Sequence, residues 1–130
     1  MGIEVSTDDR IDVVDVTDRI EAELPELECG VCTAFVEHTT AALSINEAEP
    51  RLLEDVESFV AELSAPEGWS HDALDGNADA HLRSSLFGRS VSVPIREGEL
   101  ALGTWQSVLL IECDGPRARR LSVTATPAAE

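Results

Sequence analysis

The feature that most constrains the fold of this chain is one long amphipathic segment, residues 50–63, set between short segments of strand character. Its leucine, valine and phenylalanine side chains recur at the helical period, acidic side chains fill the opposite face, and Pro50 suits the first helical position. Shorter helices are expected over 18–24 and 78–87, with Thr17 and Asn77 as N-caps. Residues rich in β-branched and small side chains predict strands at 3–6, 11–16, 31–38, 41–46, 90–95, 104–113 and 119–126. This order predicts a single α+β domain over residues 1–130, a largely antiparallel sheet or sandwich with about three helices, and not a parallel βαβ winding.

The charge of the chain is the next constraint. Asp and Glu total 26, all nine basic residues are Arg, and the formal net charge is −17. At low ionic strength such a charge strains a compact state. At about 1 M salt the Debye length is about 3 Å, and the repulsion largely vanishes. We therefore expect a halophilic protein, with an ordinary acidic protein as the plainer alternative.

The same composition argues against several classes of function. Nucleic-acid binding needs clustered Lys and Arg, and the arginines are scattered apart from Arg117, Arg119 and Arg120. The sequence has no apolar run of about 18 residues and no signal segment at Met1, so we expect no membrane partner and a cytoplasmic location. In that reducing compartment the three cysteines are expected to stay thiols.

The three histidines are the strongest candidates for chemistry, because each lies beside small polar residues. His38 ends a predicted strand, His71 lies in the loop 64–77, and His81 lies on the first turn of the short helix. A loop of that length in a compact domain favours a functional role. Three imidazoles with one open position are typical of a catalytic zinc site, so these histidines are the candidate ligands of a divalent metal, zinc first. The plainer alternative is three packed or surface histidines.

A second metal alternative uses cysteine. Cys29 and Cys32 form a CxxC pair, and Cys113 supplies one further thiolate. A lone pair is a weak zinc signal, and Cys32 also fits the strand as a small apolar residue.

Three blocks of the sequence resemble one family. The run from His38 to Glu47, HTTAALSINE, is similar to the HT(S/T)AxLxxNE signature of the YjbQ-type proteins, the secondary thiamine-phosphate synthase family. Residues 80–88, AHLRSSLFG, resemble its xHxKSSxxG block. Residues 98–112, with GTWQ at 103–106, resemble its GxxxxGTWQxxxxxE block. The blocks occur in the family's order, His71 falls where the family has a loop histidine, and the resemblance covers residues 1–126.

This resemblance implies an α+β fold that assembles as a homotrimer, with a polar site that holds the three histidines and, in some members, a metal. It also implies an activity, the joining of a pyrimidine pyrophosphate to a thiazole phosphate to give thiamine phosphate. Two departures matter. Arg83 stands where the family has Lys, which keeps the charge but loses an adjustable amine. Some members carry paired acids and a proline before His81, where this chain has only Asn77 and Asp79 as substitutes.

Such a site suits an anionic, phosphorylated small molecule as its ligand. Arg83 adds positive charge, and Glu47 and Glu112 are candidate proton acceptors or orienting groups, so these three are the candidate catalytic residues. The candidate ligand-binding residues, which offer hydrogen bonds, are Asn46, Asn77, Ser84 and Gln106. The plainer readings are a solvent-facing Ser84 and a Glu47 that caps the turn before the long helix.

Two functions from different classes remain open. The first is a transferase similar to thiamine phosphate synthase, acting on phosphorylated small molecules at the three-histidine site. The alternative is a non-catalytic trimeric protein that binds a metal or a metabolite.

Overall fold

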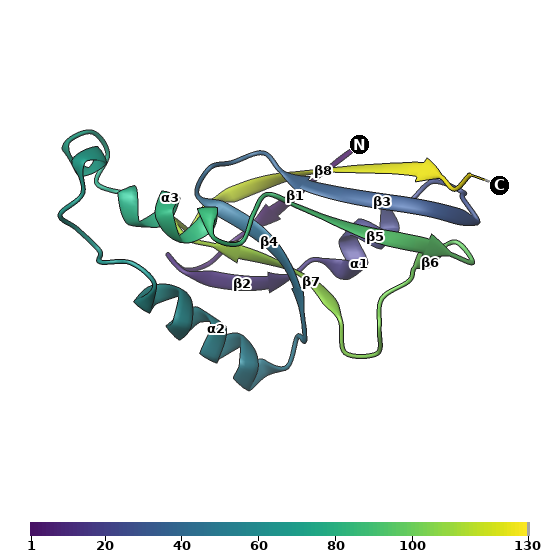
Figure 1. The fold of residues 1–130 in the computed structure, drawn as a ribbon, viewed down its shortest axis with the longest axis horizontal. Coiled ribbons are helices and arrows are strands. Elements are labelled where there is room, and N and C mark those ends of the chain that lie inside the picture. The colour runs from purple at the N-terminus through teal and green to yellow at the C-terminus, as the bar shows by residue number, and fades with distance from the viewer. Residues whose placement is uncertain (130) are drawn as a thin grey trace.

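Two antiparallel sheets carry the fold, which a computed structural model describes for residues 1–129 (Figure 1). The larger sheet has five strands in the order β1 (Gly2–Ser6), β8 (Ala118–Pro127), β3 (Cys29–Val36), β5 (Ser90–Arg96) and β6 (Glu99–Leu100). The smaller sheet has three, β2 (Asp12–Asp15), β7 (Ser107–Glu112) and β4 (Ala41–Asn46). Every neighbouring pair is antiparallel. The predicted α+β sandwich is therefore confirmed.

Three α-helices accompany the sheets in residues 1–129: α1 (Thr17–Ala22), α2 (Pro50–Glu62) and α3 (Ala78–Ser85). The helix predicted at 50–63 is confirmed, and it begins with a Glu49 side chain that accepts the Leu52 N–H at 2.8 Å. A short 3₁₀ helix, η1 (Ser70–Ala73), lies in the segment expected to be a loop. In the described part of the chain, no helix has the length and apolar character needed to cross a membrane.

The main core lies between the two sheets. Along β3 the residues Cys32, Ala34 and Val36 are buried, while Val31 and Phe35 on the other face are exposed. The buried face packs against Leu43 and Leu110 of the smaller sheet and against Ile20 of α1. In β3, therefore, every second residue faces the core between the two sheets.

A second, smaller core covers the other face of the three-stranded sheet. Ala42 of β4 and Ile111 of β7 pack there with Val60 of α2 and Ala80 of α3. In Figure 1, α2 lies on the side of this sheet away from the five-stranded one, and α3 lies beside β4 at the end of the sandwich. The molecule therefore has three layers, and this arrangement places α3 next to the end of the sandwich where the candidate site lies.

The structure corrects several details of the predicted elements. The N-cap of α1 is Val16 and not Thr17, whose Oγ1 accepts the Val108 N–H at 2.8 Å. The strand predicted at 31–38 spans Cys29–Val36, so His38 lies in the turn that follows it. The strand predicted at 104–113 begins only at Ser107, because the Gln106 side chain accepts the Gly103 N–H at 2.8 Å and holds the preceding residues in a turn. Asn77 is the N-cap of α3 as predicted, but its side chain makes no capping bond and donates to Asp114 instead.

Candidate functional site

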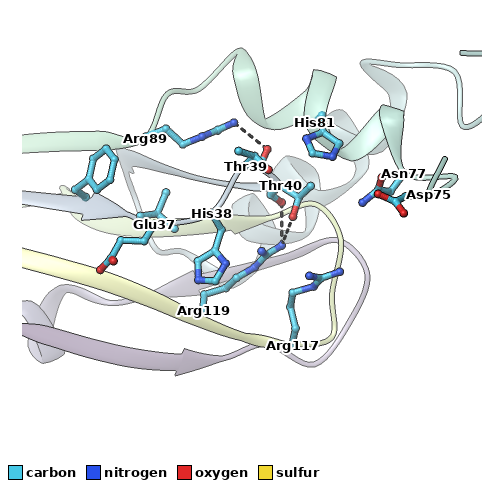
Figure 2. A pocket seen from close by; sticks show the side chains of 12 residues that line it. Glu37, His38, Thr39, Thr40, Asp75, Asn77, His81, Arg89, Arg117 and Arg119 are labelled. Atoms are coloured by element: carbon cyan, nitrogen blue, oxygen red, sulfur yellow. Dashed lines mark hydrogen bonds between the residues drawn. The ribbon is translucent and has the colours of Figure 1, made fainter. Parts of the chain in front are cut away.

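A cavity of about 780 Å³ opens at one end of the sandwich. It is bounded by the turn between β3 and β4, the first turns of α3, the residue before β5, and the start of β8 (Figure 2). Its lining is mostly polar and carries both signs of charge. The lining residues are Phe35, Val36, Glu37, His38, Thr39, Thr40, Asp75, Asn77, His81, Arg89, Arg117 and Arg119.

The turn between β3 and β4 is fixed from the α3 side by two side chains. Ser84, fully buried in α3, donates from Oγ to the Thr39 carbonyl at 2.8 Å. Arg89 donates from Nη2 to the same carbonyl at 2.8 Å and from Nη1 to the carbonyls of Ala41 and Ser84. Backbone carbonyls of the turn and of the end of α3 thereby gain side-chain donors. The turn that carries His38 is therefore held rigidly against the helix.

Arg119 lines the floor of the cavity, and the fully buried Glu112 lies behind it as its ion-pair partner. Arg119 donates to Glu112 from Nε at 2.8 Å and again from Nη2, and it also donates to the Thr40 side chain at 2.7 Å (Figure 2). Thr7 and the backbone N–H of Asp114 supply the remaining donors to the carboxylate. Burial by itself raises the pKa of Glu112, but the hydrogen bonds from Arg119, Asp114 and Thr7 outweigh burial and the pKa is lowered. The carboxylate is thus ionised and fully occupied by donors.

Arg117 is anchored at the rim of the cavity. Its Nη2 lies 2.8 Å from Oδ2 of Asp114, and the same oxygen accepts from Asn77 Nδ2 at 2.9 Å. The Arg117 side chain remains 49% exposed, so its guanidinium has donors to spare for a ligand. Asn77 Oδ1 is buried and has no partner in residues 1–129. Asn77 itself is one of the residues that line the cavity.

The cavity gathers positive charge in a strongly acidic chain. Three of the nine arginines line it, although the net charge is −17. Glu112 offsets Arg119, and Asp114 offsets Arg117. All hydrogen bonds that the Arg89 guanidinium makes within residues 1–129 go to backbone carbonyls, so no carboxylate offsets its charge through such a bond. Of the two acids in the wall, Glu37 lies 3.4 Å from Arg120.

The structure brings two of the three histidines into contact. The rings of His71 and His81 meet edge to face with centroids 4.8 Å apart, and both line a second pocket of about 300 Å³ together with Trp69 and Leu82. His81 also lines the larger cavity, as does His38. His38 Nε2 accepts the backbone N–H of Arg120 at 3.0 Å.

The predicted zinc site is not assembled within residues 1–129 of a single chain. Within residues 1–129, no group of three or more His, Cys, Asp or Glu side chains is placed to hold one metal ion. Among the candidate ligands, the His71 Nδ1 atom is buried and has no partner within residues 1–129, whereas His38 Nε2 accepts a hydrogen bond from the backbone. Burial lowers the pKa of His38, and the charges of Arg119 and Arg117 lower it further. The cysteines of the described residues offer no substitute, because Cys29 is exposed and Cys32 is buried on the opposite face of β3. Burial also raises the pKa of Cys32 and raises that of Cys113 to about 12.

Arg83, expected near the ligand, turns into the protein. It is 4% exposed, its Nη1 pairs with Asp79, and its Nη2 donates to the carbonyls of Ala61 and Ser64 at 2.9 and 2.8 Å. These carbonyls lie at the end of α2, so Arg83 joins the two helices. It does not line the cavity.

Asn46, Glu47 and Gln106 lie at the other end of the smaller sheet. Asn46 pairs with Ser107 at one end of β4, whereas Ala41 pairs with Glu112 at the cavity end. A six-residue strand spans about 17 Å, so these three residues do not reach the cavity of their own chain. Glu47 instead lines a separate pocket of about 300 Å³ with the exposed Trp105.

Sequence reasoning missed the three cavity arginines. Arg117 and Arg119 were noticed only as part of a basic group near the end of the chain, and Arg89 was not singled out. The sequence feature that could have indicated them is the group of three among the nine arginines within residues 117–120. Thr39 and Thr40 belong to the first family block, yet their contacts with Arg89 and Arg119 come from residues far along the chain.

Fold and cavity together define a class of protein, an α+β sandwich with an arginine-lined cavity at the end next to α3. The family described as "UPF0047 protein YjbQ-like" matches residues 1–128, and the chain belongs to that family. The resemblance inferred from the three sequence blocks is therefore confirmed.

Relatives and solved structures agree with this assignment. A UPF0047 protein of Archaeoglobus fulgidus is 47% identical over 96% of this chain and 99% of its own length. The UPF0047 protein YugU of Bacillus subtilis is 36% identical over 90% of this chain and 91% of its own. A hypothetical protein of Aeropyrum pernix K1 has a TM-score of 0.94 and 42% identity, covering 98% of each chain. An uncharacterised family member from Clostridium acetobutylicum has a TM-score of 0.90 and 32% identity over 97% of this chain and 99% of its own.

Proposed function

We propose that the arginine-lined cavity binds a phosphorylated small molecule and that the protein acts on it as a transferase similar to thiamine phosphate synthase. The observation that carries this proposal is the concentration of Arg89, Arg117 and Arg119 on one cavity in a chain of net charge −17. A surface of that charge repels a phosphate, so a phosphate site must hold its cations locally. Arginine suits this role because its planar guanidinium matches phosphate oxygens with two parallel donors.

The reaction that such a cavity favours is departure of a phosphate or pyrophosphate from carbon. Negative charge then grows on the leaving oxygens, and fixed cations and N–H donors stabilise it most strongly in a partly enclosed site. Arg89 and Arg117 supply cations, and His81 lies on the wall between the cavity and the second pocket. Residues 1–129 of a single chain hold no group of three ligands placed around one metal ion, so no step is assigned to a metal.

Glu112 takes a positioning role in this scheme. All of its acceptor capacity is directed at Arg119, Thr7 and the Asp114 backbone, which leaves no oxygen free to take a proton from a ligand. Through Arg119 it also fixes Thr40 at the base of the turn that carries His38. Its contribution to function is therefore the geometry of the cavity.

We further propose that the protein is a homotrimer in which the far end of one subunit completes the cavity of the next. Asn46, Glu47 and Gln106 belong to the family blocks, yet they lie about one strand length from the cavity of their own chain. If these residues contribute to the ligand site, they must come from another copy. The Glu47 carboxylate complements an arginine-rich cavity in charge, and the amides of Asn46 and Gln106 can offer hydrogen bonds.

Calorimetric titration with inorganic pyrophosphate at high salt tests the binding step. We expect Arg117→Met to weaken binding about tenfold, since a hydrogen bond between charged groups contributes roughly 1.5–3 kcal/mol. Arg96→Met is the matched control because the substitution removes the same charge. Arg96 is exposed on β5 and does not line the cavity. Equal affinity in both variants, or no binding by the natural sequence, would reject the proposal.

Turnover is tested separately, with a pyrimidine pyrophosphate and a thiazole phosphate as the substrates and pyrophosphate release as the measurement. Release that is lost in Arg117→Met and kept in Arg96→Met supports the transferase. Tight pyrophosphate binding without turnover of either compound supports the alternative, a trimeric protein that binds a metabolite.

A further inference from the structure

The His38 side chain replaces a main-chain acceptor at the end of the β3–β8 ladder. The two strands pair regularly up to Val36 and Leu121. At the next step the Glu37 N–H donates to the Arg120 carbonyl at 3.0 Å, as a regular antiparallel pair requires. The reciprocal donor, the Arg120 N–H, goes to Nε2 of the His38 imidazole at 3.0 Å. The ring is thereby tied to the backbone of β8 while it lines the cavity.

This hydrogen bond decides which ring nitrogen carries the proton. A neutral imidazole has one N–H donor and one acceptor nitrogen. Since Nε2 accepts from a backbone N–H, the proton of the neutral ring is on Nδ1. Nδ1 has no hydrogen-bond partner in residues 1–129. It is also not one of the side-chain nitrogen and oxygen atoms that are buried without a partner in that part of the chain. It is thus an accessible donor on a residue of the cavity wall.

The surroundings of the ring disfavour the two other states. A second proton on Nε2 would face the Arg120 N–H and would add a cation beside Arg119 and Arg117 on the same cavity. Moving the single proton from Nδ1 to Nε2 would set two donors against each other and leave the Arg120 N–H without its acceptor. Metal ligation through Nδ1 needs the tautomer with the proton on Nε2, because only an unprotonated nitrogen can bind a metal.

We infer that His38 serves the cavity as a neutral donor, offering its Nδ1–H to an anionic oxygen of the ligand, and that it is not a zinc ligand. This inference rests on the proposed binding of a phosphorylated molecule and assigns one of its contacts. It also disagrees with the ligand set implied by the family resemblance, for a reason that lies in the backbone of β8. His38 is then a ligand-binding residue that neither accepts nor releases a proton.

The tautomer is measured directly on the natural sequence, without any ligand. Long-range ¹H–¹⁵N correlation spectra at neutral pH and high salt distinguish a protonated from an unprotonated ring nitrogen, and the His38→Asn variant assigns the signals. We expect a protonated Nδ1 and an unprotonated Nε2. A protonated Nε2, alone or together with Nδ1, would overturn the inference and leave the proposed function untouched.

Two isosteric variants then separate the roles of the two nitrogens. The Asn amide reaches the place of Nδ1, so His38→Asn keeps a donor toward the cavity and loses the acceptor for Arg120. The longer Gln side chain reaches the place of Nε2, so His38→Gln keeps that acceptor and loses the donor. With inorganic pyrophosphate as the probe, we expect His38→Gln to bind about tenfold more weakly than His38→Asn. Thermal unfolding of both variants shows that each is folded.

The opposite order of affinities would overturn the donor role, and so would equal affinities. Equilibrium dialysis with zinc provides a second check. Stoichiometric zinc binding by the natural sequence that disappears in both variants would show ligation by His38 and overturn the inference. Failure of the natural sequence to bind pyrophosphate would reject the proposed function and the donor role together, which the spectra alone would not do.

Discussion

Arg119 and Glu112 form a buried ion pair that joins the two sheets. Glu112 ends β7 of the three-stranded sheet, Arg119 lies in β8 of the five-stranded sheet, and the two residues are 0% and 1% exposed. The same guanidinium donates to Thr40, the last residue of the turn before β4. The floor of the cavity is therefore also a connection between layers, and its integrity matters for both stability and ligand binding.

Removing one member of this pair should destabilise the fold strongly. Arg119→Met leaves the Glu112 carboxylate buried without its cation, and such a change costs about 3–5 kcal/mol in the free energy of unfolding. The double variant Arg119→Met/Glu112→Leu removes both charges and should lose less than the single variant. Urea unfolding at high salt measures both. If the double variant is no more stable than Arg119→Met, the coupling between the two charges is not the cause of the loss.

The pair also predicts how stability depends on pH. The pKa of Glu112 in the folded protein lies below the ordinary value of 4.5. Above that value both states are ionised and the contribution of Glu112 is complete. As the pH falls below about 4.5 the unfolded chain binds a proton first, so this contribution is lost progressively down to the folded pKa. In urea unfolding between about pH 6 and pH 3 at high salt, the natural sequence should lose more stability than Glu112→Gln. Parallel pH profiles would contradict the prediction.

The sequence reveals the local elements of this fold better than the site. The α2 helix was predictable because its apolar period and Pro50 are features of one continuous segment. Residues 104–106 were misassigned to a strand because one side-chain bond, from Gly103 N–H to Gln106, turns the chain there. The periodicity of apolar residues in the sequence gives no indication of such a side-chain hydrogen bond.

The candidate site depends on contacts between distant segments. His38 and His81 could be found as polar histidines, and the structure does place both on the cavity. Arg119 meets Thr40 across 79 positions of sequence and Arg89 meets Thr39 across 50, so neither contact follows from local spacing. Arg83 was assigned to the ligand because of its place in a family block, but its orientation is set by its pairing with Asp79 and by carbonyls at the end of α2.

The proposed sharing of the site between subunits can be tested by mixing variants. Gln106→Ala impairs the far end of a subunit, and Arg117→Met impairs the cavity, so each variant alone should bind pyrophosphate weakly. Mixed trimers formed by unfolding and refolding the two together should regain some intact sites, each built from one undamaged cavity and one undamaged end. Light scattering should give three times the mass of the chain. Full binding by Gln106→Ala alone would show that Gln106 does not contribute to the site.

The final prediction concerns the effect of salt on stability, because the acidic surface decides at which ionic strength the other measurements should be made. With 26 acidic residues against nine arginines, repulsion acts across the whole surface at low ionic strength. Raising the salt from about 0.1 M to about 1 M shortens the Debye length from about 10 Å to about 3 Å, and repulsion between neighbouring carboxylates is then screened. We therefore expect the midpoint of thermal unfolding to rise with KCl.

Sucrose, which stabilises by exclusion from the surface without adding ions, separates screening from a general solvent effect. The amide variant Glu54→Gln/Asp55→Asn/Glu62→Gln removes three exposed charges of α2 with little change of shape, and its unfolding midpoint should depend less on KCl. An unfolding temperature of the natural sequence that stays the same across this range of KCl would contradict the predicted salt dependence. The protein would then be an ordinary acidic protein, and its ligand binding could be measured in dilute buffer.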